Sequence, residues 1–181
     1  MSRIGRLPIK LGKGVSASFS NGVVTVKGGL GSLTQEIQNP NIGITIEGDI
    51  VHVTRTNEEK ETKSAHGLYR AIIRNMAEGV EKGYTKGLVI NGVGYKATVV
   101  GSKIVLSIGY SHDITLNVPQ GIKVDVVSPT ELTVKGIDKE AVGQYAAEIK
   151  ALRKPDPYHA YGIRYKDETI VKKEGKTAGK K

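Results

Sequence analysis

The sequence predicts an α+β protein made of two tandem duplicated domains, each a mostly antiparallel sheet with one packed helix. Three observations predict this fold: an internal repeat, apolar residues at alternate positions early in each copy, and apolar residues at helical spacing late in each copy. Alternation is typical of strands with one buried face, and a spacing of three and four residues is typical of an amphipathic helix.

Four segments occur in the same order in both halves of the chain. Residues 14–29 share glycine, alanine and apolar positions with residues 94–109, at an offset of 80 residues. The strongest match joins 65–74 to 141–150, which share the pattern Ala-x-Gly-x-Tyr-x-Ala-x-Ile followed by a basic residue. The other matches pair 42–46 with 122–126 and 51–53 with 132–134. One order and nearly one offset indicate a duplicated unit of about 80 residues.

Strands are expected first in each half. Asn21-Gly22 separates two alternating runs and predicts a tight hairpin, because both central residues of such a turn adopt positive φ. In the second half the alternating apolar residues that predict half-buried strands are Ile104, Leu106 and Ile108, then Ile114, Leu116 and Val118.

One helix is expected to follow the strands of each half. The first is predicted over residues 59–79 with Gly79 as its stop, and its apolar face comprises Ala65, Leu68, Tyr69, Ile72, Ile73 and Met76. The second is predicted to start at Asp138 as N-cap and to end before Pro155. Its buried residues are expected to be Val142, Tyr145, Ile149 and Leu152.

The chain is basic, and its excess charge lies at the two ends. It has 27 Lys and Arg against 18 Asp and Glu, for a formal charge of +9. Residues 1–13 carry +4 and residues 150–181 carry +6, so the body between them is close to neutral. This distribution favours two arms that bind a polyanion, although solvated tails are the ordinary alternative.

Several classes of function find no support. The chain has no Cys, which excludes disulfides and thiolate zinc sites. Its four histidines are scattered, and we interpret them as lone exposed residues rather than as a metal cluster: His52, His66, His112 and His159. The N-terminus lacks the apolar stretch of a signal peptide and no run is long enough to span a membrane, so we expect a soluble, non-secreted protein.

Three motifs resemble catalytic or nucleotide-binding patterns but lack the required context. Residues 92–97 precede a predicted strand where a dinucleotide site needs a helix, and residues 175–177 lack both the first phosphate-loop glycine and a following helix. Ser111-His112-Asp113 are adjacent in extended chain, so their side chains alternate in direction and cannot form a relay. The sequence therefore predicts no enzyme activity, no cofactor and no small-molecule substrate.

The segment 153–166 interleaves basic and aromatic residues with two prolines and Gly162. Looped RNA is bound by this mixture, because cations engage phosphates while Tyr and His rings stack on exposed bases. Alternatively, Tyr158 or Tyr165 caps the core of the second half with its hydroxyl satisfied. The following tail is too polar to fold alone and is expected to order on a partner.

The whole chain closely resembles the bacterial family of large-subunit ribosomal protein six (ribosomal protein L6). The motifs that carry the resemblance, in order, are Ser2-Arg3-Ile4-Gly5-Arg6, Gly92-Val93-Gly94-Tyr95, Gly109-Tyr110-Ser111-His112, Val142-Gly143-Gln144 and the segment 155–165. One departure is His159-Ala160-Tyr161, where the family usually has Lys-Gly-Lys. The change removes two expected phosphate contacts, for which stacking by His159 or Tyr161 can substitute.

The resemblance implies a structural constituent of the cytoplasmic ribosome that supports subunit assembly and translation. It implies binding to large-subunit ribosomal RNA near the sarcin-ricin loop and the base of the factor-binding stalk, beside neighbouring ribosomal proteins and close to translational GTPase factors. The expected RNA-binding residues are Arg3, Arg6, Tyr110, Ser111, His112, Arg153, Lys154, Tyr158, His159, Tyr161, Arg164, Lys166, Lys172, Lys173 and Lys176. For Ser111 an ordinary strand turn is an equal alternative.

The expected organisation follows from the repeat, the charge and the resemblance. Residues 1–81 form the first repeat with a basic arm, 82–166 form the second repeat and main RNA-binding domain, and 167–181 form a basic tail. The competing functional hypothesis is a free RNA-binding regulator or RNA chaperone that is not stably ribosomal. A peripheral membrane protein is disfavoured, because the polar face of the first predicted helix mixes acids and bases.

Overall fold

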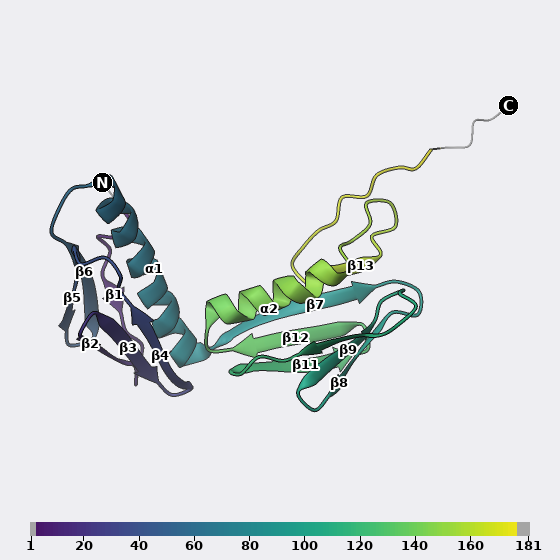
Figure 1. Cartoon of the computed structure of the whole chain (residues 1–181), viewed down its shortest axis with the longest axis horizontal. Helices are drawn as coiled ribbons and strands as arrows, with labels where there is room; N and C mark the ends of the chain where they lie inside the picture. The colour runs from purple at the N-terminus through teal and green to yellow at the C-terminus, as the bar shows by residue number, and fades with distance from the viewer. Residues whose placement is uncertain (1–2, 177–181) are drawn as a thin grey trace. The chain divides into compact units, whose positions relative to one another are not determined.

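The first half of the chain forms two three-stranded sheets and one helix in a computed structural model, which describes residues 3–176 (Figure 1). One sheet has the order β2-β3-β4 and the other β1-β6-β5. Their bounds are β1 (Ile9–Lys10), β2 (Ser16–Ser20), β3 (Val23–Gly28), β4 (Gly31–Glu36), β5 (Ile42–Glu47) and β6 (Ile50–Arg55). Helix α1 (Lys60–Lys82) packs against β3, β4 and β6.

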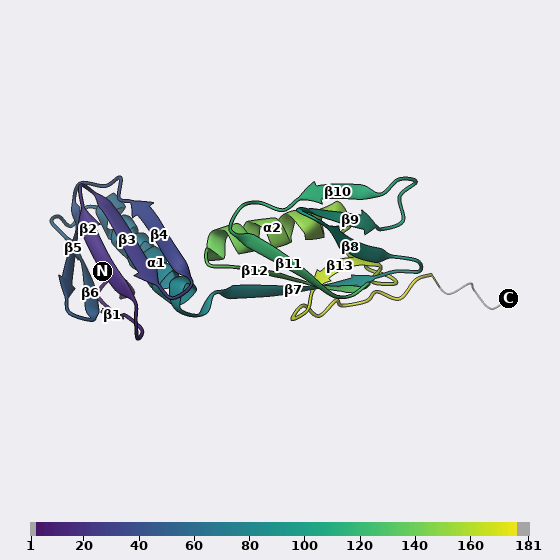
Figure 2. The ribbon, with the colours of Figure 1, turned by 90° about the horizontal axis from the view of Figure 1, so that it is seen from below.

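The second half repeats this topology and adds a strand. Strands β8, β9 and β10 correspond to β2, β3 and β4, and in the order β11-β12-β7-β13 the first three strands correspond to β5, β6 and β1 (Figure 2). The bounds are β7 (Tyr84–Asn91), β8 (Lys96–Val100), β9 (Lys103–Ser107), β10 (Ile114–Asn117), β11 (Ile122–Ser128), β12 (Glu131–Gly136), α2 (Lys139–Leu152) and β13 (Gly162–Tyr165). The predicted α+β duplication is confirmed, with the strands of each copy divided between two sheets.

The chain divides into two compact units. Unit 1 comprises the described residues up to Tyr84 together with Ile137–Lys139, and unit 2 comprises Thr85–Gly136 and the described residues from Glu140 onward. Only Gly83 separates α1 from β7. Its φ of 72° is readily adopted by glycine, and its N–H donates to the Gly79 carbonyl at 2.9 Å. The helix therefore ends at Lys82, with Gly83 as its C-cap, and not at the predicted Gly79.

Two other local predictions are confirmed. Asn21 and Gly22 have φ of 51° and 77° and join β2 to β3, with Ser20 opposite Val23. Helix α2 begins directly after Asp138 and ends at Leu152, before Pro155. On its inner side Val142, Tyr145 and Ile149 are buried as predicted, whereas Leu152 is only half-buried.

The buried face of α1 is rotated relative to the prediction. Leu68 is 57% exposed, and polar residues share the buried face with Tyr69, Ile73 and Met76. His66, expected to be exposed, is buried: its Nε2 lies 2.8 Å from the Val53 carbonyl and its Nδ1 lies 3.0 Å from Arg55 Nη1. The buried Arg70 donates to the carbonyls of Leu7 and Pro8. Because polar groups can be buried when they are hydrogen-bonded, apolar spacing alone misplaced this face.

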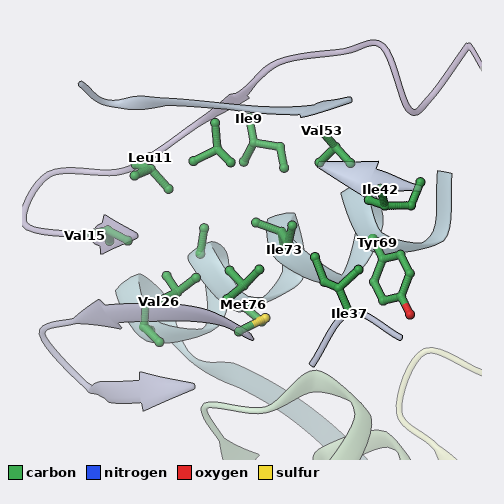
Figure 3. Packing of buried hydrophobic residues seen from close by; sticks show 14 residues of the cluster. Ile9, Leu11, Val15, Val26, Ile37, Ile42, Val53, Tyr69, Ile73 and Met76 are labelled. Carbon is green, nitrogen blue, oxygen red and sulfur yellow. The ribbon is translucent and has the colours of Figure 1, made fainter. Parts of the chain in front are cut away.

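Tyr69 lies at the edge of the core of unit 1, which surrounds Ile73 and Met76 (Figure 3). Its hydroxyl accepts a hydrogen bond of 3.0 Å from the N–H of Gln38. The repeat gives Tyr145 the same place on α2, and Tyr145 is also buried. Yet its hydroxyl is the one buried side-chain polar atom among the described residues that has no hydrogen-bond partner.

The missing partner is explained by a proline. The N–H of Ile37 donates to the Gly22 carbonyl and the N–H of Val118 donates to the Ser102 carbonyl, both at 2.8 Å, so Ile37 and Val118 are equivalent. The next residue is Gln38 in unit 1 but Pro119 in unit 2, and proline has no N–H to donate. Burial without a partner raises the pKa of Tyr145 to about 12, with Glu148 adding to the effect.

The two tyrosines should therefore respond differently to loss of the hydroxyl. Tyr69→Phe should lower the free energy of unfolding by about 1 kcal/mol, because it removes a made hydrogen bond. Tyr145→Phe should leave it unchanged or raise it by up to about 1 kcal/mol, because the buried hydroxyl it removes is unpaired. Urea unfolding of the full chain measures both. Equal destabilisation by the two variants would contradict the explanation.

Candidate nucleic-acid interface

Three loops of unit 2 meet at the end where β7 finishes. We call residues 91–95, 108–113 and 153–161 together the loop end. The Asn91 side-chain amide donates to the Ala160 carbonyl at 3.1 Å, and the Tyr110 hydroxyl donates to the Leu152 carbonyl at 3.0 Å. These bonds join loops that are far apart in sequence.

Two glycines, one in each of the first two loops, make room for the Tyr95 ring. A Cβ on Gly109 would lie 2.6 Å from the Tyr95 hydroxyl, and a Cβ on Gly92 would overlap the same ring. Both glycines have positive φ, and Gly109 at 80° lies in the left-handed region. The Tyr95 ring therefore fills the space that side chains would otherwise occupy. The motif Gly92-Val93-Gly94-Tyr95 is visible in the sequence, but no sequence pattern indicated that Tyr95 belongs to the site.

Arg153 is the cation at the centre of the loop end. Its guanidinium carbon lies 5.0 Å from the centre of the Tyr110 ring, and the Tyr110 and His112 rings stack at 6.4 Å and 25°. Hydrogen bonding to Tyr110, with a further contribution from Tyr95, raises the pKa of Arg153 above its ordinary value. Arg153, which is charged at physiological pH like any arginine, is thus held by aromatic contacts while its side chain stays accessible.

The third loop is closed by a backbone contact that only glycine permits. The N–H of Ile163 donates to the Arg153 carbonyl at 2.7 Å. A Cβ on Gly162, whose φ is 143°, would lie 2.7 Å from that carbonyl oxygen and 2.6 Å from the carbonyl oxygen of Lys154. Figure 1 shows the segment leaving α2 and returning to β13. The close approach turns residues 154–161 into a compact loop.

Asp156 organises the interior of this loop. Its carboxylate accepts the His159 N–H at 2.7 Å, and its own N–H donates to the Tyr161 carbonyl at 3.0 Å. The backbone bond from His159 lowers the pKa of Asp156. On the outside of the loop the rings of His159 and Tyr161 stack at 5.3 Å and 17°, and Tyr158 is exposed.

The chain after the loop is fastened to unit 2 through Tyr165. Lys86 Nζ and Lys150 Nζ lie 4.8 and 4.5 Å from the centre of its ring. Lys150 also forms an ion pair with Glu168 at 2.7 Å, which lowers the pKa of that carboxyl. Of the two tyrosines considered for a structural role, Tyr165 is the half-buried one and Tyr158 is not.

Internal partners engage two of the predicted RNA-binding cations. Arg164 lies in β13, and its Nη1 donates to the Glu168 carbonyl at 2.9 Å and to the Tyr165 carbonyl at 3.4 Å. Lys166 forms an ion pair with Glu131. A phosphate would have to compete with these partners, or bind the N–H donors of Arg164 and Lys166 that these partners do not engage.

The remaining predicted residues fall into three groups. Ser111 and Lys154 are exposed within the loop end. Arg3 and Arg6 are exposed in unit 1 and do not belong to this cluster. Lys172, Lys173 and Lys176 are exposed in irregular chain, where the Lys173 N–H donates to the Pro157 carbonyl at 2.8 Å. The rest of the predicted tail, 177–181, lies outside the described residues.

Other kinds of site find no support in the described part of the chain. Residues 3–176 contain no group of three His, Asp or Glu side chains placed to hold a metal ion. Neither described helix is long and apolar enough to cross a membrane.

Comparison with known proteins gives full-length matches. The model of the family described as "Ribosomal protein L6" matches residues 11–83 and again 91–166. "Large ribosomal subunit protein uL6" of Carboxydothermus hydrogenoformans is 49% identical over 180 residues, covering 99% of this chain and 98% of the relative. The protein of the same name from Trichlorobacter lovleyi is 50% identical, and the match covers 100% of both chains. That from Exiguobacterium sibiricum is also 50% identical, and the match covers 98% of this chain and 99% of the relative.

The loop closure can be tested with two glycines of unit 2. Gly162→Ala should lower the free energy of unfolding by about 2–4 kcal/mol, because the new Cβ would press on two backbone carbonyls. It should also speed hydrogen exchange at the Ile163 amide. Gly143→Ala is the matched control: it lies on the exposed face of α2 with open space around it, and should stabilise by about 0.5–1 kcal/mol. Slow exchange at Ile163 in Gly162→Ala would contradict the closure.

Proposed function

The chain belongs to the ribosomal protein L6 family, and on that premise we propose that the loop end of unit 2 binds large-subunit ribosomal RNA. The family model matches both repeats, and the curated relatives match end to end under the name of a large-subunit ribosomal protein. As a member of this family the chain is a structural protein of the large ribosomal subunit in the cytoplasm, and it is not an enzyme. Its partners are the RNA and proteins of that subunit.

The observation that carries the proposed binding surface is the convergence of three loops on Arg153. A guanidinium that is held on the Tyr110 ring presents its N–H groups in a fixed direction, which suits bidentate contact with a phosphate. Lys154 adds a second exposed cation, and the rings around them offer faces on which bases can stack. Cation and ring together are the combination that looped RNA requires.

The mechanism is structural. Cations neutralise phosphates where RNA segments pack together, and a rigid protein surface fixes the positions of those phosphates. We place the binding site near the sarcin-ricin loop and the base of the factor-binding stalk, close to translational GTPase factors, as the resemblance implies. Arg3, Arg6, Lys172, Lys173 and Lys176 would act as flanking arms that add phosphate contacts outside the loop end.

Arg153 should contribute about one phosphate contact to RNA binding. Arg153→Gln should weaken binding to protein-free large-subunit rRNA and reduce the slope of log K against log salt by about one. Lys103→Gln is the matched control, because Lys103 is an exposed cation of β9 that lies outside the loop end. Filter binding at several salt concentrations measures both slopes. Equal slopes for Arg153→Gln and the unmodified protein would remove Arg153 from the interface.

The proposal as a whole is tested by sedimentation. A lysate of cells that make the chain from its own gene is run through sucrose gradients at moderate and high salt, and the protein is followed by mass spectrometry. We expect stoichiometric migration with the large subunit that survives high salt. Recovery mainly at the top of the gradient would favour a free RNA-binding regulator or chaperone instead.

A further inference from the structure

We propose that the stacked rings of His159 and Tyr161 form a platform for one unpaired nucleobase of RNA. This inference rests on the proposed function, and it specifies that the loop 154–161 binds a base of the RNA. The alternative for the same loop is a contact with the phosphate backbone, which is how its neighbour Arg153 is proposed to act.

The geometry of the pair suits base stacking. The two rings are nearly parallel, at 17°, with their centres 5.3 Å apart, the offset arrangement that aromatic groups prefer. Both remain open to solvent: the His159 side chain is 70% exposed and Tyr161 is 41% exposed. A nucleobase that stacks on the pair would extend an existing stack, and every base has a face that can do so.

Hydrogen bonds hold the backbone of the platform in place before any RNA binds. Asp156 accepts the backbone N–H of His159 and lies 3.3 Å from Nδ1 of its ring. Ala160 lies between the two aromatic residues and has a left-handed φ of 61°. Its N–H donates to the Asp156 carbonyl at 2.9 Å, and its carbonyl accepts a hydrogen bond from the Asn91 side chain. Because these bonds fix the backbone on both sides of the rings, little conformational entropy is lost on binding.

The local charge favours a base over a phosphate. The Asp156 carboxylate lies directly beside the His159 ring and, like any solvent-accessible aspartate, is ionised at neutral pH. A phosphate placed on the rings would lie close to this negative charge. A neutral base would not be repelled, and Arg153 and Lys154, earlier in the same segment, can hold the phosphates of the nucleotides next to it.

The test measures the affinity of the full chain for protein-free large-subunit rRNA over a range of salt. Tyr161→Leu should weaken binding about tenfold at every salt concentration, with an unchanged slope, because stacking is lost and no charge is removed. Tyr161→Phe keeps the ring and should bind like the unmodified protein. His159→Leu should weaken binding with the same unchanged slope. Thermal unfolding checks that both leucine variants remain folded.

Zero-length ultraviolet crosslinking with peptide mass spectrometry supplies a second measurement. We expect an RNA adduct on His159 or Tyr161 that disappears in Tyr161→Leu. Unchanged affinity of both leucine variants, or absence of any adduct in 154–161, would overturn the platform while leaving rRNA binding by Arg153 intact. A change of slope in Tyr161→Leu would also overturn it, since that indicates a phosphate contact. Failure of the unmodified protein to bind rRNA would instead defeat the proposed function.

Discussion

The loop end depends on one short backbone contact, between the Ile163 N–H and the Arg153 carbonyl at the end of α2. Gly162 makes it possible, because any side chain there would meet the carbonyls of residues 153 and 154. The contact aligns β13 on β7, where Ile163 lies opposite Ile90, and it fixes the start of the loop that presents His159 and Tyr161. The arrangement of cation and rings thus depends on a hydrogen bond that involves none of their side chains.

Duplication explains the scaffold but not the interface. Both units share six strands in the same order and a buried tyrosine on the helix, yet among the described residues only unit 2 has a seventh strand, β13, and the loop before it. The two copies differ at this tyrosine. The Gln38 N–H donates to the Tyr69 hydroxyl, whereas the equivalent residue Pro119 has no N–H to donate to Tyr145. The features proposed to bind RNA lie largely in the segment that follows the second copy of the helix, which has no counterpart in the first.

Sequence patterns predicted what is local and missed what is tertiary. The Asn21-Gly22 hairpin and the ends of α2 follow from residue types whose backbone preferences are strong. The buried face of α1 was misplaced at Leu68 and His66, because an apolar period defines a wide arc and cannot foresee a buried, hydrogen-bonded histidine. In the candidate site, composition identified Arg153 and the aromatic residues of the segment 153–166, the family resemblance added Tyr110 and His112, and Tyr95 was missed. It could not predict the contact between Arg153 and Tyr110, or that Arg164 and Lys166 have partners within the chain.

The pairing of β13 with β7 also affects when the loop end can form during synthesis of the chain. The ribosome synthesises a chain from its N-terminus, and β13 follows every other strand of unit 2 and its helix α2. Until residues 162–165 emerge, β7 has an open edge and the loop before β13 has no anchor. The surface that we propose to bind RNA is therefore complete only after synthesis has passed β13.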